Sequence, residues 1–179
     1  FQGGYAKSEK SSNTVYKFAA SIGHADLHAI NLDPRAKSEI QLRTNANFTR
    51  TGKGDILGRI DVGEIMLESD EGRQDIGNIV LTSHSADNRY RIRLDSGFAD
   101  ATFTGTASIV DFIKDLSNVT LKKEMPALYE DPEYSLSGNT YSLDFKCHDV
   151  QGILAFALPG LYIENGTSLH AELDSKGIM

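Results

Sequence analysis

The sequence predicts a mainly β fold, in which an antiparallel meander forms a curved, trough-like or sandwich-like sheet with one or two short helices. The first observation is that apolar and polar residues alternate in many short segments, as they do on half-buried strands. The second is that short turn-forming segments separate these strands, which is typical of antiparallel neighbours. The third is that the apolar spacing changes from two residues to a helical period at Ser108.

The clearest hairpin prediction lies in Tyr90–Ala107, where Gly97 separates two runs of alternating apolar and polar residues. Directly after it, Ser108 and Asp111 have the spacing of a capping box. Apolar residues then recur at intervals of three and four up to Leu116. We therefore expect a short helix to follow the hairpin.

The first strand is predicted at Val15–Ile22, after a polar segment, and Gly23 ends it. The next segment, His24–Leu32, could be a second strand or a turn. Pro34 closes this segment, because proline cannot continue a strand ladder.

Clear alternation in Glu39–Thr49 and Ile56–Leu67 predicts two half-buried strands joined by a loop. Gly63 indicates a β-bulge, since the apolar residues after it continue in the opposite phase. A further strand, Ile79–Ser83, leads through a turn into the hairpin.

The last part of the chain repeats the order of strand and short helix. Tyr141–Cys147 is predicted to be a strand, and Asp149–Leu158 a helix capped by Asp149 and ended by Pro159. A closing hairpin is expected to turn at Asn165–Gly166.

Composition favours one domain and makes nucleic acid an unexpected partner. The 179 residues carry a net charge of -7 without a basic cluster, so nucleic acid is not expected as a partner. Cys147 is the only cysteine, and the apolar alternation around it predicts a buried structural thiol. Residues 1–3 resemble the remnant of a protease-cleaved expression tag and are set aside, so 4–179 is expected to be a single β-rich segment.

No catalytic residue, metal or cofactor is expected. His24 and His28 have a metal-like spacing, but two surface histidines are the favoured interpretation because no third ligand stands nearby. His148 precedes the Asp149 cap and has no placed nucleophile, so a hydrolase triad is disfavoured. The glycines around Lys53 lack the order of a phosphate-binding loop.

The apolar strand faces leave two interpretations open. In a closed sandwich, these faces meet and form an ordinary core, and function lies in the exposed loops of a structural or adhesive module with a protein partner. In an open curved sheet, the apolar face forms a groove, which implies a lipid or protein partner.

Three segments together resemble the TamB proteins of the bacterial AsmA-like superfamily, in the form found in Bacteroides and relatives. These are Ile40–Leu67 with its Asn-Ala-Asn-Phe-Thr run, Arg89–Leu116 with its Asp-Ser-Gly-Phe-Ala-Asp-Ala hairpin and helix, and Asn139–Gly177 with its Asn-Gly-Thr turn. They cover more than half of the chain, and the order of the motifs carries the resemblance.

The resemblance implies a segment of a longer, repetitive periplasmic protein, anchored in the inner membrane of a Gram-negative bacterium. It also implies a hydrophobic β-trough without catalytic residues. Such a trough serves phospholipid transport between the inner and outer membranes, outer-membrane protein assembly beside a barrel partner, or both. Phospholipid acyl chains are the expected ligand. By their alternation, the residues expected to line the groove are Ile40, Leu42, Phe48, Ile60, Val62, Ile92, Leu94, Phe103, Leu143, Phe145 and Leu169.

Overall fold

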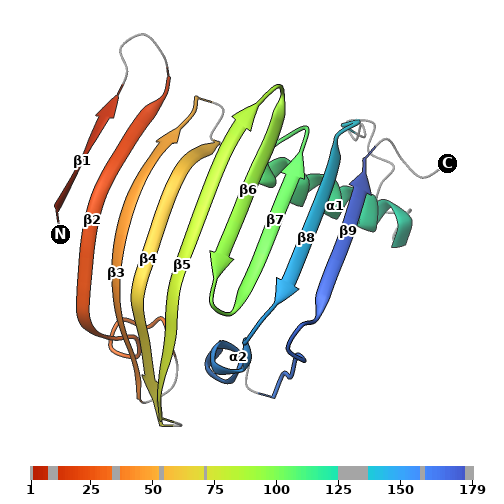
Figure 1. The fold of residues 1–179 in the computed structure, drawn as a ribbon. Helices are drawn as coiled ribbons and strands as arrows, with labels where there is room; N and C mark the ends of the chain where they lie inside the picture. Colours follow the sequence, from red (N-terminus) through yellow and green to blue (C-terminus); the bar gives the residue numbers. More distant parts are fainter. Residues whose placement is uncertain are drawn as a thin grey trace.

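The strands of the computed structural model form one antiparallel sheet, in which each strand pairs with the next one along the chain (Figure 1). The prediction of a mainly β antiparallel meander with one or two short helices is thereby confirmed, and two helices are present. The structure describes residues 2–7, 12–33, 37–52, 55–70, 72–124, 137–157 and 160–175. Its elements are β1 (Gln2–Lys7), β2 (Thr14–Asp26), β3 (Ser38–Arg50), β4 (Ile56–Ser69), β5 (Gly72–Ala86), β6 (Arg89–Ser96), β7 (Ala99–Gly105), α1 (Ile109–Glu124), β8 (Thr140–Cys147), α2 (Gln151–Ala157) and β9 (Ser168–Asp174).

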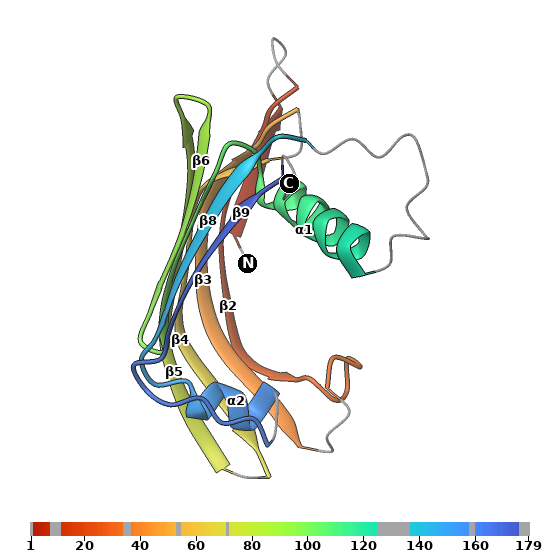
Figure 2. The ribbon, with the colours of Figure 1, turned by 90° about the vertical axis from the view of Figure 1, so that its right-hand side faces the viewer.

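The sheet is curved and open. Seen from the side, it bends into a trough, and both helices lie on its concave side (Figure 2). β1 and β9 are the two edges of the described sheet and do not pair with each other. The nine strands therefore form neither a closed barrel nor two packed sheets, and a trough rather than a sandwich describes the arrangement.

The hairpin and the start of α1 agree with the sequence prediction. β6 and β7 pair antiparallel around Gly97, and α1 begins at Ile109. The Asp111 N–H donates to the Ser108 hydroxyl oxygen at 3.2 Å, and the Ser108 N–H donates to an Asp111 carboxylate oxygen at 3.3 Å. This reciprocal pair is the predicted capping box. The helix continues beyond Leu116, where its prediction ended, to Glu124.

We expect Ser108→Ala to lower the free energy of unfolding by about 1 kcal/mol, because the first turn of α1 loses its cap. Chemical unfolding followed by circular dichroism measures this change. Ser117→Ala is the matched control, since the Ser117 hydroxyl donates to the Ile113 carbonyl at an exposed position on the same helix. A cost at Ser108 no larger than at Ser117 would contradict the role of the cap.

The bulge predicted at Gly63 is confirmed. The pairing of β4 with β5 shifts register between Val62 and Ile65, and Glu64 has a φ of 54°. The extra residue returns Ile65 and Leu67 to the face that Val62 occupies, and both are buried. The bulge therefore keeps the apolar side of a long strand facing one way.

Two predictions near the N-terminus were wrong. β2 does not end at Gly23 but continues to Asp26, and its pairing with β3 shifts register beyond Ile22. The chain then turns, so that the Leu27 N–H donates to the Ser38 carbonyl at 2.7 Å. β1 was also missed, because residues 1–3 are set aside and the polar segment that follows shows no strand pattern. Pro34 and Lys53 lie outside the described residues.

The C-terminal hairpin was also wrong. Residues 161–163 form no described strand, and β9 pairs with β8 instead. The turn at Asn165–Gly166 exists, with Gly166 at a φ of 86°, and it starts this longer-range pairing. Asp149 is not the N-cap of α2. The Leu154 N–H donates to the Val150 carbonyl at 2.8 Å, and this first helical bond makes Val150 the N-cap residue. Pro159 lies outside the described residues.

Candidate functional site

The nine described strands carry most of their apolar side chains on one common face of the sheet. Residues opposite each other in antiparallel strands share a face, so the register can be followed from strand to strand. One such row reads Phe18, Ala46, Ile60, Leu81, Leu94, Ala101, Phe145 and Leu169. The register and the two-residue period place all of the predicted groove residues on this face, namely Ile40, Leu42, Phe48, Ile60, Val62, Ile92, Leu94, Phe103, Leu143, Phe145 and Leu169.

This apolar face is the concave one, and α1 covers part of it. The ring centroid of Phe112, on α1, lies 5.3 Å from that of Phe103 and 5.2 Å from that of Tyr141. Figure 2 shows α1 inside the curve of the sheet. Phe103 and Tyr141 are each only 4% exposed. Phe103 therefore belongs to a small core beneath the helix and does not line an open surface.

A buried polar network fastens α1 to the ends of β8 and β9. The Asp115 carboxylate accepts hydrogen bonds from the Tyr141 hydroxyl at 2.6 Å, the Ser137 hydroxyl at 2.6 Å and the Asn139 side-chain amide at 3.1 Å. The Ser137 hydroxyl also lies 2.7 Å from the hydroxyl of Ser175, which is fully buried. The network holds α1 against the concave face at a defined place.

Burial and hydrogen bonding act in opposite directions on the pKa of Asp115. Burial alone raises this pKa, but the bonds donated by Ser137, Tyr141 and Asn139 outweigh it, so the pKa lies below its ordinary value. Burial, followed by the bond to Asp115, raises the pKa of Tyr141 well above its ordinary value. Asp115 is therefore a carboxylate, and Tyr141 a neutral donor, at neutral pH.

The opposite end of the trough holds a second covered region. Cys147, Val150 and Leu154 are buried together, and Phe145 is among the half-buried side chains that pack against them. Cys147 has no exposed surface, which agrees with the predicted buried thiol. Gly152 of α2 approaches β5 so closely that an added Cβ would lie 2.4 Å from the Gln74 side-chain oxygen. The α2 segment is therefore packed onto the concave face.

Between and beside the helices, apolar side chains of the concave face stay partly exposed. Phe48 stacks on Tyr16 with ring centroids 5.1 Å apart, yet both side chains are only half-buried. Leu81 and Leu94 oppose each other in the middle of the sheet and are also half-buried. On α1, four further apolar side chains are at least one-third exposed: Ile109, Val110, Ile113 and Leu116.

The convex face is polar and charged. Arg59 pairs with Asp61 at 2.8 Å and Arg93 with Asp95 at 2.9 Å, each two residues apart on one strand. Near the β9 edge, the His170 Nδ1 lies 2.6 Å from an Asp144 oxygen, and this hydrogen bond raises the pKa of His170. The sheet is thus amphipathic, with a solvated outer face and an apolar inner face.

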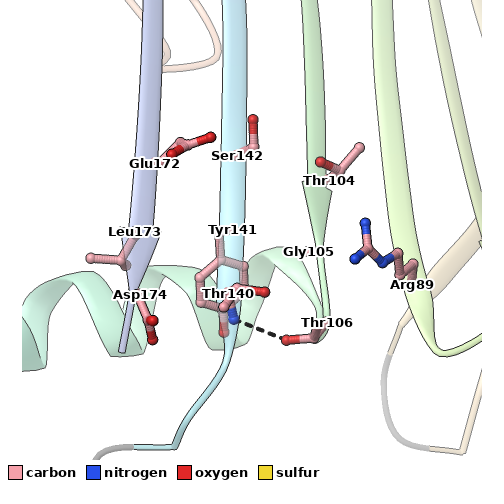
Figure 3. Close-up of a pocket in the computed structure, with 10 residues that line it drawn as sticks. All are labelled: Arg89, Thr104, Gly105, Thr106, Thr140, Tyr141, Ser142, Glu172, Leu173 and Asp174. Carbon is pink, nitrogen blue, oxygen red and sulfur yellow. Dashed lines mark hydrogen bonds between the residues drawn. The ribbon is translucent and has the colours of Figure 1, made fainter. Parts of the chain in front are cut away.

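A hollow of about 310 Å³ lies at the end of β6–β9, and Figure 3 shows its lining residues. Thr104, Ser142 and Glu172 form one cross-strand row on the convex side, whereas Tyr141 points to the concave side and α1. Arg89 adds a positive charge on the β6 side of the hollow, and Glu172 and Asp174 add negative charges on the β9 side (Figure 3). The lining contains hydroxyls and charges of both signs.

The histidines singled out from the sequence lie apart from the concave face. The His24 Nδ1 lies 3.3 Å from Glu39, and the His28 Nδ1 lies 3.3 Å from the Asp33 carbonyl oxygen. The His148 Nε2 lies 2.9 Å from Asp100 on the polar side of the sheet. Within the described ranges, no group of three or more His, Cys, Asp or Glu side chains is arranged to hold a metal ion.

Several residues of the concave face were missing from the predicted lining. Tyr16 and Phe18 alternate with polar residues in β2, a pattern that would have placed them on the same face. The sequence places Tyr141 in a strand, but its contact with α1 depends on how α1 packs onto the sheet, which the strand pattern does not show. The clustering of Asp115 with residues 137–141 has no short-range signal in the sequence.

The fold and the face define a class: an open, amphipathic antiparallel sheet whose apolar concave side is only partly covered by two helices. No family model, curated protein or solved structure matches this chain. No helix in the described part of the chain is long and apolar enough to cross a membrane.

Proposed function

We propose that the concave face binds phospholipid acyl chains, and that the chain is a non-catalytic periplasmic segment of a TamB-like protein. In this proposal, the parent protein is anchored in the inner membrane of a Gram-negative bacterium. Its trough serves phospholipid transport to the outer membrane, outer-membrane protein assembly beside a barrel partner, or both. The observation that carries the proposal is the partly uncovered apolar face on a sheet whose other face is polar.

The energetics of apolar burial support an acyl chain as the ligand. Each buried methylene gains about 0.8 kcal/mol, so a few methylenes along the concave face offset the cost of ordering a chain. The rows of half-buried residues run across the strands from β2 to β9, and a flexible chain can follow them. A ligand of this kind needs no directional hydrogen bond, and the floor of the trough presents mostly hydrocarbon.

The proposal is tested by native mass spectrometry of the purified chain together with extraction of bound lipid. Leu81→Asp and Leu94→Asp place a carboxylate in the middle of the concave face, on β5 and β6. Thr82→Asp is the matched control, since Thr82 lies on the convex face opposite Arg59 and Arg93. We expect phospholipid on the parent chain and on the control, and a loss of more than tenfold, or about 1.4 kcal/mol, in the two concave variants.

Two results would overturn the acyl-chain proposal. Equal lipid content in the concave and convex variants would mean that lipid is carried elsewhere. A lipid-free parent chain, whose concave variants stay folded by circular dichroism but lose a co-purifying protein, would favour the alternative of a structural module with a protein partner.

A further inference from the structure

The edge strand β9 leaves the backbone groups of one side open for pairing with a further strand. Among the described strands it pairs only with β8, and every residue of Ser168–Asp174 except Leu173 is exposed. Natural sheets protect such edges with proline, lysine, bulges or a covering element. The β9 sequence contains neither proline nor lysine, and its pairing with β8 has no register shift.

The backbone of β9 shows which groups face the open side. The Cys147 N–H donates to the Thr167 carbonyl at 2.8 Å, and the Ser175 N–H donates to the Asn139 carbonyl at 2.9 Å. In an antiparallel ladder, residues that exchange hydrogen bonds alternate with residues that do not. The odd-numbered residues of β9 therefore bond to β8, and the N–H and C=O groups of His170 and Glu172 point away from it.

We propose that β9 pairs antiparallel with β9 of a second copy of this chain, with Ala171 opposite Ala171 on the two-fold axis. This register places His170 of each copy opposite Glu172 of the other. On the concave side it places Leu169 opposite Leu173. A two-fold axis perpendicular to the sheet keeps the same face inward in both copies, so the two apolar faces would join.

Charge complementarity selects this register. A shift by two residues in one direction opposes Glu172 to itself, and a shift in the other direction opposes His170 to itself. A shift by one residue opposes apolar and polar side chains, because directly opposite residues share a face. The shift that opposes Glu172 to itself also opposes His170 to Asp174, but it keeps a like-charge contact on the two-fold axis. The proposed register combines two opposite-charge pairs and an apolar concave row with no residue of like charge opposed to itself. Parallel pairing of β9 with β1 of another copy would give an open-ended chain and lacks this self-complementarity.

Disulfide trapping tests the pairing and the register together. Residues opposite each other without exchanged hydrogen bonds have Cα atoms about 4.5 Å apart, within the range that a disulfide spans. We expect Ala171→Cys to give a covalent dimer under mild oxidation. Leu169→Cys is the matched control on the same exposed face, and its two copies would lie about 13 Å apart in this register. The native Cys147 is fully buried and does not compete.

The Ala171→Cys and Leu169→Cys results each have a clear meaning. A covalent dimer of Ala171→Cys with a monomeric Leu169→Cys supports the proposal. Equal crosslinking of both variants, or crosslinking of neither at millimolar chain concentration, overturns it.

A charge variant tests the same interface without a covalent bond. Glu172→Lys places a lysine opposite His170 at both pairs and so removes both opposite-charge contacts. We expect it to weaken the dimer by roughly tenfold in analytical ultracentrifugation. Ser142→Lys is the control, because Ser142 lies opposite Glu172 on β8 and the variant introduces a lysine one strand away from the edge. Dimerisation that resists Glu172→Lys but is lost in Ser142→Lys would overturn the proposal.

Discussion

Phe103→Ala is expected to lower the free energy of unfolding by about 3–5 kcal/mol, the usual cost of removing a buried aromatic side chain. Phe103 is 4% exposed and packs against Phe112 and Tyr141, with ring centroids 5.3 Å and 5.9 Å away. Its removal leaves a cavity between α1 and the sheet and loses both aromatic contacts. Urea unfolding followed by circular dichroism measures the effect.

Leu169→Ala is the control for this prediction, because Leu169 lies on the same concave face but is 53% exposed. We expect Leu169→Ala to cost less than about 1 kcal/mol, since an exposed side chain leaves no cavity. Equal costs at the two positions would mean that the covered and open parts of the concave face do not differ in packing.

The difference between these two residues explains what alternation can and cannot predict. Both residues were expected to line a groove, and both lie on the concave face. The two-residue period of a strand determines which face a side chain occupies, so a sequence pattern suffices for that step. Whether another element covers the face depends on where α1 returns to the sheet, and the pattern within a strand contains no information on this.

The errors at the strand ends have a related cause. The sequence pattern places a strand end at Gly23, yet β2 continues through this glycine beside the register shift. The pairing of β9 with β8 was missed because α2 and a turn lie between them, and a local hairpin satisfied the same alternation. By contrast, the capping box at Ser108 and the bulge at Gly63 depend on neighbouring residues only, and both predictions were correct.

The part of the concave face that α1 covers differs from the part that we propose to bind a ligand. α1 covers Phe103 and Tyr141 but leaves the Leu81 and Leu94 region of the concave face half-buried. A ligand on the open region would therefore border the helix rather than displace it. If the proposed function holds, variants that loosen α1 change fold stability first, whereas Leu81→Asp changes ligand binding and leaves the Asp115 network intact.

Asp115→Ala is expected to lower the free energy of unfolding by about 3 kcal/mol, because it leaves the buried Tyr141 hydroxyl without its acceptor. The same substitution removes the acceptor of the Ser137 and Asn139 bonds. Thermal or urea unfolding at pH 7 measures the loss. Asp111→Ala is the matched control on α1, since it removes a carboxylate from the helix cap and leaves this network intact.

Asp115 should also make stability depend on acid pH. Burial raises the pKa of Asp115, the bonds from Ser137, Tyr141 and Asn139 lower it further than burial raises it, and the folded pKa lies below the unfolded one. The carboxylate therefore stabilises the fold above its unfolded pKa of about 4, and this contribution is lost as the pH falls through the lower folded pKa. Asp115→Asn keeps the shape but cannot titrate, so we expect its unfolding free energy to fall less between pH 6 and pH 3 than that of the parent chain. An equal fall in the parent chain and the variant would mean that other carboxylates cause the acid sensitivity. The polar network would then hold α1 without a contribution from the charge of Asp115.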